Sequence, residues 1–267
     1  MAAYEHYLQP ILDLAIAAGE KIVEIYDQGC CVEQKSDNTP VTIADYAAHD
    51  LIVAGLSIIA PEIPCLSEES EGITTAERQS WGRYWLVDPL DGTRDFINRT
   101  GEFSVNIALM ERDCPVLGVI YAPITGMFYY AARGFGAWKG ERGSSPHPIH
   151  VRRCDPQRVV VTCGRSTHSP LLQQFCERLP GYEIIRLGSA LKSCLVAEGG
   201  ADIYARFGPT SEWDTAAAQC VVEEAGGRVS DLALHPLRYN SRDHLLNPHF
   251  FVTGESDLYW PGFVPSA

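Results

Sequence analysis

The sequence contains no apolar run long enough to cross a membrane. Its longest apolar stretches, residues 116–123 and the interrupted stretch 11–18, fall well short of the roughly 18 to 20 residues that a membrane-spanning helix needs. The opening residues MAAYEHYLQP carry neither the basic segment nor the cleavage site of a secretion signal. We therefore expect no transmembrane segment and a cytoplasmic location.

Positive charge is also scarce. The chain has 21 lysines and arginines against 34 aspartates and glutamates, which gives a formal net charge of −13. A protein of this charge does not attract a nucleic-acid polymer or an anionic membrane surface over long distances. An anionic ligand would need local cations or a bound metal ion.

Sequence patterns of several common chemistries are missing. The nine cysteines are odd in number and contain no CxxC pair, so we expect reduced thiols rather than a disulfide framework or a zinc site. His147 and His150 are spaced like metal ligands, but the prolines around them predict a loop, and we do not expect them to bind metal. A GxxxxGK phosphate-binding loop and a GxSxG serine-hydrolase motif are both absent, which excludes those two classes.

The 267 residues, 46% of them hydrophobic, suffice for one folded unit with two lobes. The spacing of apolar residues predicts an amphipathic helix over 8–26. A second helix is expected after Pro40, with Thr42 as its N-cap and Asp45 completing a capping box. Runs rich in β-branched and aromatic residues predict a largely antiparallel sheet, with strands near 84–88, 103–110, 116–123 and 126–133.

From residue 158 onward, strand-like and helix-like segments alternate, which predicts an α/β second lobe. We thus predict an α/β (α+β) fold with a mostly antiparallel N-terminal lobe, residues 1–150, and an α/β C-terminal lobe, residues 151–267. The stretch near 140–155 is the expected boundary. The segment Gly134–Gly140 partly matches a dinucleotide-binding loop, but its glycine spacing favours a hairpin turn.

The acidic residues show the most informative pattern. Asp88 and Asp91 end an apolar strand, and Pro89 and Gly92 impose a tight turn there. Two carboxylates that converge at one point suit a hard divalent cation such as Mg²⁺, although an Asp-rich turn without function has the same sequence.

Two further acidic positions strengthen the functional interpretation. Glu68 and Glu69 follow another strand-like segment, and Asp214 precedes a helix-like one. Each alone is explained as a solvated charge or as a helix-start residue. Together with the segment 88–91, they offer a metal site built from three regions of the chain.

The segments SEE (67–69), WLVDPLDGT (85–93) and WDTAA (213–217), in this order and at these separations, resemble the inositol monophosphatase superfamily of Mg²⁺-dependent, lithium-sensitive phosphatases. SDNTPVTIAD, GEFSVNIAL, GSALK and ARFGPTSEWDTAA are similar, more specifically, to its 3′(2′),5′-bisphosphate nucleotidase branch of the CysQ type. The resemblance implies a layered αβαβα sandwich of the inositol monophosphatase / fructose-1,6-bisphosphatase type.

The resemblance also implies an activity. The protein would be a Mg²⁺-dependent enzyme that hydrolyses the 3′-phosphate of adenosine 3′,5′-bisphosphate (PAP) to AMP and phosphate, and converts the sulfated form PAPS to APS, in connection with sulfur assimilation. Water would attack directly, without a covalent phosphoenzyme. An inositol monophosphatase or sugar phosphatase of the same superfamily is the alternative, and an inactive binding protein is disfavoured by the intact acidic positions.

The resemblance implies metal ligands as well. Glu68, Asp88 and the Leu90 carbonyl would hold one Mg²⁺, and Asp88, Asp91 and Asp214 a second, with two or three ions per site in all. Glu69 is a weaker candidate that would act through a water.

The remaining site residues are implied in the same way. Asp45 and Thr93 would position and activate the attacking water. The substrate would be contacted by Glu68, Leu90, Asp91, Gly92, Thr93 and Asp214, and by His168, Ser189, Lys192 and Arg206 of the second lobe. Ser189 is expected to cap a helix whose free N–H groups face a phosphate, with Lys192 one turn inside. The alternative is an ordinary cap and a solvated charge, and Ala190 departs from the Gly-Ser-Ser-x-Lys that is usual in the branch.

The expected partner is a small nucleotide bisphosphate, bound by a monomer or homodimer. A peripheral position at the cytoplasmic face of the inner membrane is an alternative to a purely cytoplasmic one. A haloacid dehalogenase-like phosphatase has a similar DxDGT motif, but Pro89 stands where its nucleophilic aspartate is needed. That chemistry is therefore excluded.

Overall fold

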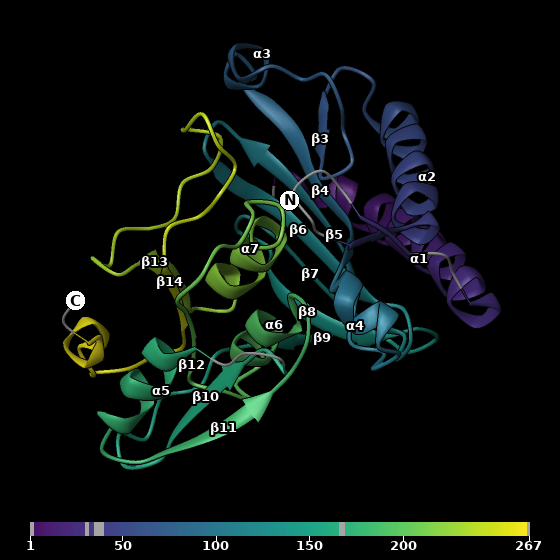
Figure 1. Ribbon diagram of the computed structural model, residues 1–267. Helices are drawn as coiled ribbons and strands as arrows, with labels where there is room; N and C mark the ends of the chain where they lie inside the picture. The colour runs from purple at the N-terminus through teal and green to yellow at the C-terminus, as the bar shows by residue number, and fades with distance from the viewer. Residues whose placement is uncertain (1–2, 30–31, 35–39, 166–168, 266–267) are drawn as a thin grey trace.

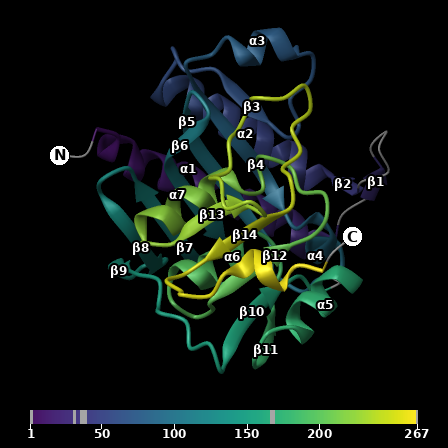
Figure 2. The ribbon, with the colours of Figure 1, turned by 90° about the vertical axis from the view of Figure 1, so that its left-hand side faces the viewer.

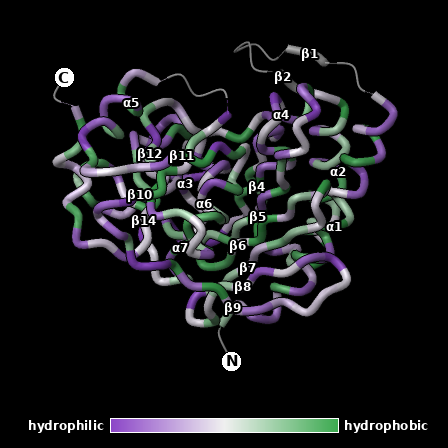
Figure 3. Tube along the Cα trace, turned by 90° about the horizontal axis from the view of Figure 1, so that it is seen from below, coloured by the Kyte–Doolittle hydropathy of each residue, from purple (hydrophilic) through white to green (hydrophobic). Residues whose placement is uncertain are grey.

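The computed structural model describes residues 3–29, 32–34, 40–165 and 169–265. Two main sheets alternate with three layers of helices (Figure 1). Hydrophobic stretches concentrate along the central strands (Figure 3). None of the described helices is both long enough and apolar enough to cross a bilayer.

The larger sheet has seven strands, which follow one another in sequence order. They are β3 Cys65–Ser67, β4 Arg83–Asp91, β5 Ser104–Glu111, β6 Cys114–Ala122, β7 Met127–Ala132, β8 Gly136–Glu141 and β9 His147–Ile149. The β3–β4 pair is parallel and all other pairs are antiparallel. The segment Gly134–Gly140 forms part of the turn and most of the second strand of the β7–β8 hairpin, as predicted.

Helices α1, Glu5–Gln28, and α2, Ile43–Ile59, cover one face of this sheet (Figure 1). Strand β4 is buried on both sides, with Trp85 and Val87 in the core beneath these helices and Leu86 in the core on the opposite face. A strand covered on both faces needs a continuous apolar run, which the sequence provides from residue 84 to 87.

Helices α6, Leu191–Ala197, and α7, Ala216–Glu224, lie between the two sheets (Figure 1). The second sheet has the strand order β11-β10-β12-β14-β13. Its strands are β10 Val159–Cys163, β11 Tyr182–Arg186, β12 Ile203–Arg206, β13 Arg228–Asp231 and β14 Phe250–Thr253. Helix α5, Pro170–Glu177, and the 3₁₀ helix η1, Trp260–Phe263, belong to the hydrophobic cluster on its outer side.

Short elements complete the fold. They are the two-stranded pair β1 Val32–Gln34 and β2 Pro40–Thr42, and the helices α3 Thr75–Gln79 and α4 Thr93–Ile97. The segment 232–249 extends from the second sheet toward α3 (Figure 2), where Arg78 donates to the carbonyls of Arg242 and Asp243, both at 2.8 Å. This contact joins the two halves of the chain away from the second sheet.

The predicted αβαβα architecture is confirmed, with layers α1/α2, seven strands, α6/α7, five strands and α5. The capping box of α2 is confirmed too, since Thr42 and Asp45 form both of its bonds. The sheets separate between residues 149 and 159, but α7 packs on the first sheet from within the second half. The division at 150 stays a prediction.

Candidate active site

The carboxylates of the segment 88–91 converge because β4 contains a β-bulge. Asp88 pairs with Asn106 and Asp91 with Ser104, so β4 has one residue more than β5 between these pairs. Residues three apart in a regular strand point to opposite faces, whereas the additional residue returns Asp91 to the face of Asp88. Pro89 suits this position because it has no N–H to donate to a neighbouring strand.

The backbone then turns sharply into α4. The Leu90 N–H donates to Asp88 Oδ1 at 3.1 Å, and Gly92 has a φ of 92°. A Cβ at Gly92 would be strained in this conformation and would lie 3.1 Å from the Glu102 carbonyl oxygen. The turn brings the Thr93 hydroxyl to within 3.3 Å of the Leu90 carbonyl oxygen.

Asp214 reaches the same place from the other half of the chain. It lies just before α7, and its Oδ2 accepts from the Ser211 N–H at 3.1 Å. Helix α7 packs on the seven-stranded sheet at Gly118, where an added Cβ would lie 2.2 Å from the Ala217 carbonyl oxygen. The absence of a side chain at Gly118 thus permits the close approach that carries Asp214 to β4.

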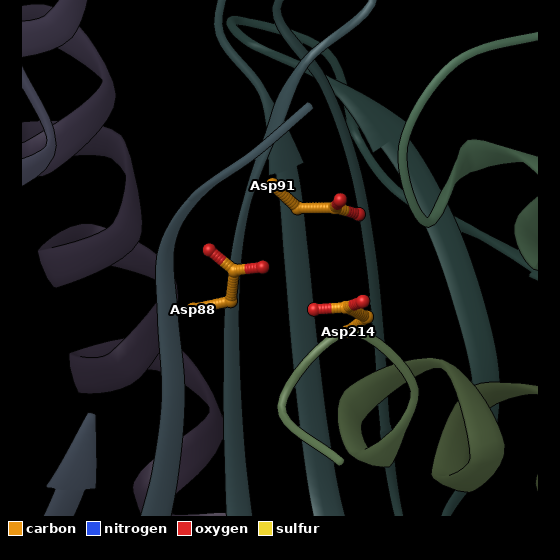
Figure 4. Close-up of side chains that lie close together, drawn as sticks. All are labelled: Asp88, Asp91 and Asp214. Carbon is orange, nitrogen blue, oxygen red and sulfur yellow. The ribbon is translucent and has the colours of Figure 1, made fainter. Parts of the chain in front are cut away.

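The carboxylates of Asp88, Asp91 and Asp214 form an acidic cluster whose ligand atoms all lie within 4.8 Å of one another (Figure 4). Burial raises the pKa of Asp88 well above its usual range, and the neighbouring charges, first that of Glu68, raise it further. Burial and the charge of Asp91 raise the pKa of Asp214 in the same way. These raised pKa values reflect the cost of holding several negative charges together in a buried place. A bound cation would offset that cost, so a cluster of this kind favours one.

Glu68 lies beside this acidic cluster. It follows β3, and its N–H donates to the Val87 carbonyl oxygen at 3.0 Å. The parallel pairing of β3 with β4 therefore carries Glu68 to the same end of the sheet as Asp88.

The predicted catalytic pair is in contact. Thr93 Oγ1 donates to Asp45 Oδ1 at 3.3 Å. The other oxygen of the buried Asp45 carboxylate, Oδ2, accepts from the Thr42 N–H and the Thr42 hydroxyl, both at 2.7 Å. Asp45 thus completes the capping box with one oxygen and faces Thr93 with the other.

The acidic cluster, Glu68 and Thr93 line one cleft of about 690 Å³, whereas Asp45 is not among its lining residues. Every predicted substrate-binding residue except His168 lines it, and His168 lies outside the described residues. The cleft wall also carries four cationic side chains, Arg94, Arg165, Lys192 and Arg206. Acidic and basic groups therefore share a single cavity.

Lys192 is held in place by its surroundings. Its Nζ donates to the Ser189 carbonyl oxygen and lies 5.4 Å from the centre of the Tyr204 ring. Burial lowers the pKa of Lys192, and the negative charge of Asp91 opposes that shift. The ammonium group therefore lies in the cleft wall, close enough to the acidic cluster to interact electrostatically with Asp91.

Arg206, at the end of β12, is anchored as well. Its Nε donates to Thr210 Oγ1 at 2.7 Å, and a terminal nitrogen donates to the Pro209 carbonyl oxygen at 2.8 Å. Such contacts limit the rotamers of a long side chain and so reduce the entropy lost on binding an anion.

The predicted helix cap at Ser189 is wrong. Helix α6 begins at Leu191, its N-cap is Ala190, and no side-chain capping bond forms. Ser189 instead has a φ of 48°, and its hydroxyl lies 2.8 Å from that of Ser104. The contact with β5 directs the Ser189 hydroxyl away from the helix end.

Sequence reasoning missed the polar side chains at the start of β5. Asn106 Nδ2 donates to Asp91 Oδ2 at 3.3 Å, and Ser104 Oγ donates to Asn106 Oδ1 at 2.8 Å. Glu102, just before the strand, accepts two bonds from Arg165, at 2.6 and 2.5 Å. The alternation of polar with apolar residues in the segment GEFSVN (101–106) could have indicated that one face of this strand is polar.

The chain is similar to known proteins over most of its length. The chain matches the model of the inositol monophosphatase family over residues 3–255. It is 48% identical over 248 residues to the 3′(2′),5′-bisphosphate nucleotidase CysQ of Salmonella typhimurium, covering 92% of this chain and 99% of that protein. A 3′(2′),5′-bisphosphate nucleotidase CysQ of Aggregatibacter actinomycetemcomitans is 42% identical over 257 residues, covering 96% and 95%.

Solved structures show the same relationship. CysQ from Bacteroides thetaiotaomicron has a TM-score of 0.81 at 37% identity and covers 95% of this chain and 98% of its own. An IMPase from Thermotoga maritima has a TM-score of 0.74 at 26% identity, with coverages of 93% and 92%. The chain belongs to the inositol monophosphatase family. The resemblance to its CysQ-type nucleotidases, seen in the sequence motifs, is confirmed.

Proposed function

We propose that this chain is a metal-dependent 3′(2′),5′-bisphosphate nucleotidase. Relatives of that name are 40 to 48% identical to it over most of its length. The proposed reaction is hydrolysis of the 3′-phosphate of PAP to give AMP and phosphate, and of PAPS to give APS, in connection with sulfur assimilation.

One observation carries the proposal: the acidic cluster and fixed cations share a single cleft. A bisphosphate nucleotide has a scissile phosphate and a second phosphate several ångströms away. A cation held by the acidic cluster would neutralise only the first, so the second requires positive side chains of the protein. Lys192 and Arg206 meet this requirement, whereas a simple monophosphate ester would not need them.

The acidic cluster fits a hard divalent cation because its ligand atoms are all oxygens, closely spaced and partly dehydrated. We infer that Glu68, Asp88 and the Leu90 carbonyl hold one Mg²⁺, and that Asp88, Asp91 and Asp214 hold another, with two or three ions per site. Bound there, Mg²⁺ would neutralise charge on the transferred phosphoryl group and make the attacking water more acidic. Lithium inhibition, by competition for one of these positions, is part of the proposal.

Thr93 and Asp45 would direct the attacking water. Thr93 Oγ1 lies 3.3 Å from both Asp45 Oδ1 and the Leu90 carbonyl oxygen, and its single proton can go to only one of them. With the Leu90 carbonyl engaged by Mg²⁺, we infer that the proton goes to Asp45, which leaves the lone pairs of Thr93 to accept from a water. The water proton then moves toward Asp45 and the water oxygen is oriented for attack on phosphorus.

A substrate comparison tests the proposal. The purified protein with Mg²⁺ should hydrolyse PAP with a kcat/KM at least about tenfold above that for inositol 1-phosphate. The reason is that the two phosphates of PAP interact both with the cation at the acidic cluster and with the positive side chains, whereas a single phosphate interacts with the cation alone. Excess chelator should abolish phosphate release, and Mg²⁺ should restore it. A preference for inositol 1-phosphate would favour the inositol or sugar phosphatase alternative, and full activity in chelator would reject metal dependence.

A further inference from the structure

The loop before α6 is attached to the N-terminal half of the chain at three successive residues. The bonds are Gly188 N–H to Glu102 Oε2 at 2.9 Å, Ser189 Oγ to Ser104 Oγ at 2.8 Å, and Ala190 N–H to the Asp91 carboxylate. Residue 192, whose lysine is proposed to bind the second phosphate, follows directly. Its position relative to the acidic cluster is therefore set by these attachments.

The middle attachment belongs to a hydrogen-bond chain whose direction can be deduced. Asn106 Nδ2 donates to Asp91 Oδ2, so the amide oxygen of Asn106 faces Ser104 and accepts from its hydroxyl. Ser104 must then donate its single proton to Asn106. The contact between the two serines consequently requires Ser189 to be the donor and Ser104 the acceptor.

The backbone of this loop is fitted closely to its partner. Ser189 adopts a φ of 48°, which is unfavourable for a residue with a side chain. A Cβ at Gly188 would lie 2.5 Å from the Glu102 carbonyl oxygen, so only glycine allows this approach. Ser104 and Asn106 are 0% and 1% exposed, and water does not compete for their bonds.

We propose that Ser104 and Asn106 are positioning residues: they engage the only hydroxyl proton of Ser189 and thereby hold the loop 188–190, and with it Lys192 at the start of α6, beside the acidic cluster. Ser189 then acts through Ser104 and donates no hydrogen bond to the substrate. The strand β5 becomes a determinant of bisphosphate selectivity, an inference that rests on the proposed function of Lys192.

A double-mutant cycle tests the assignment. Ser104→Ala and Ser189→Ala should each raise KM for PAP about three- to tenfold, as expected for loss of one hydrogen bond. Because both changes remove the same bond, KM of the double variant should not exceed that of the single variant with the higher KM. KM for adenosine 3′-monophosphate, which lacks the second phosphate, should change little. If the two losses multiply instead, Ser189 contacts the substrate independently and the proposal is wrong.

A measurement without substrate separates this inference from the proposed activity. In the Mg²⁺-loaded protein, Ser104→Ala should increase amide hydrogen exchange across residues 188–192, because the loop loses one of its attachments. Ser230→Ala, which changes a buried serine on the distant strand β13, serves as the matched control and should leave that exchange unchanged. Unaltered exchange in Ser104→Ala would overturn the positioning role, whereas a parent protein inactive on PAP would instead reject the proposed function.

Discussion

Asp88 shows the conflict between stability and function within one side chain. Its carboxyl is 1% exposed, and burial together with the nearby charges of Glu68, Asp91 and Asp214 raises its pKa. A carboxyl whose pKa is raised by folding binds protons better in the folded state, so it destabilises that state above its unfolded pKa of about 4. Without metal, the contribution of Asp88 to stability therefore becomes less favourable as the pH rises from about 4 through its folded-state pKa.

Asp88→Asn should consequently be more stable than the parent in chelator at neutral pH, and its stability should depend less on pH. The asparagine retains an oxygen that can accept from the Leu90 N–H but carries no charge. Urea unfolding in chelator at pH 5 and pH 8 measures both effects. Activity with Mg²⁺ should fall by a factor of about a hundred or more, as for loss of a metal ligand. A variant less stable than the parent in chelator at pH 8 would contradict the argument.

The Thr93 hydroxyl gives a second prediction at this scale. Thr93→Ala should lower kcat about ten- to a hundredfold with little change in KM, because the hydroxyl contributes mainly when the water attacks. Thr93→Ser keeps the group that donates to Asp45 Oδ1 and should recover most of the lost rate. Steady-state kinetics of the two variants provide the comparison, and equal rates for alanine and serine would exclude a role for the hydroxyl.

Lys192 gives a third prediction at the scale of single residues. A charge-assisted contact to phosphate contributes about 1.5 to 3 kcal/mol, so Lys192→Ala should raise KM for PAP roughly ten- to a hundredfold. KM for adenosine 3′-monophosphate should remain within about a factor of two or three of the parent value. Lys21→Ala, at an exposed lysine of α1, controls for the loss of one positive charge from the molecule. Equal effects of Lys192→Ala on both substrates would remove Lys192 from the second-phosphate site.

At the scale of elements, the helix and hairpin predictions succeeded where the signals are local. The capping box of α2 involves only Thr42, Ala44 and Asp45, and the apolar spacing of α1 repeats over its whole length. The convergence of Asp88 and Asp91 was expected from a tight turn. Its actual cause, the bulge, depends on pairing with β5 and is not encoded in the segment alone.

The helix cap at Ser189 failed for the same reason. A serine one or two residues before a helical pattern is a good cap by local rules. Here its hydroxyl bonds to Ser104, which is 85 positions away in the sequence, and the backbone takes a conformation that no local preference predicts. Tertiary contacts overrode propensity at the point where the two halves of the site meet.

Helix α7 supplies a prediction for a whole element. Gly118→Ala would place a methyl group 2.2 Å from the Ala217 carbonyl oxygen and should push α7 from the sheet. We expect a loss of about 1 to 3 kcal/mol in the free energy of unfolding, measured in urea, with reduced activity because Asp214 moves with the helix. Gly82→Ala, where an added Cβ meets nothing within 4 Å, is the matched control and should be nearly neutral. An unaltered unfolding midpoint for Gly118→Ala would show that the helix accommodates the methyl group.

For the molecule as a whole, the proposed metal site joins the two halves of the chain. Its proposed ligands come from the residue after β3 and from β4 in the first half, and from the turn before α7 in the second. With a net charge of −13 on the chain, bound cations also reduce electrostatic repulsion. Metal binding should therefore stabilise the entire fold rather than one loop.

Mg²⁺ should accordingly raise the Tm of the parent protein. An ion present at a hundred times its Kd adds about 2.7 kcal/mol to the free energy of unfolding. Calorimetric scans with and without chelator measure this shift, and Asp91→Asn should show a much smaller one because it loses a proposed ligand. Identical Mg²⁺ responses of the two proteins would place the ion elsewhere.

The bulge in β4 also has a consequence for how sequences of this family can diverge. One residue separates a strand on which Asp88 and Asp91 share a face from a strand on which they point apart. An insertion of one residue between Ser104 and Asn106 would let β5 pair regularly with β4, and it would turn one carboxylate toward the layer of α1 and α2 although every acidic residue stays in the chain. A descendant of this protein could thus abandon catalysis through a change of length alone, while its inventory of acidic residues still matched that of a working enzyme.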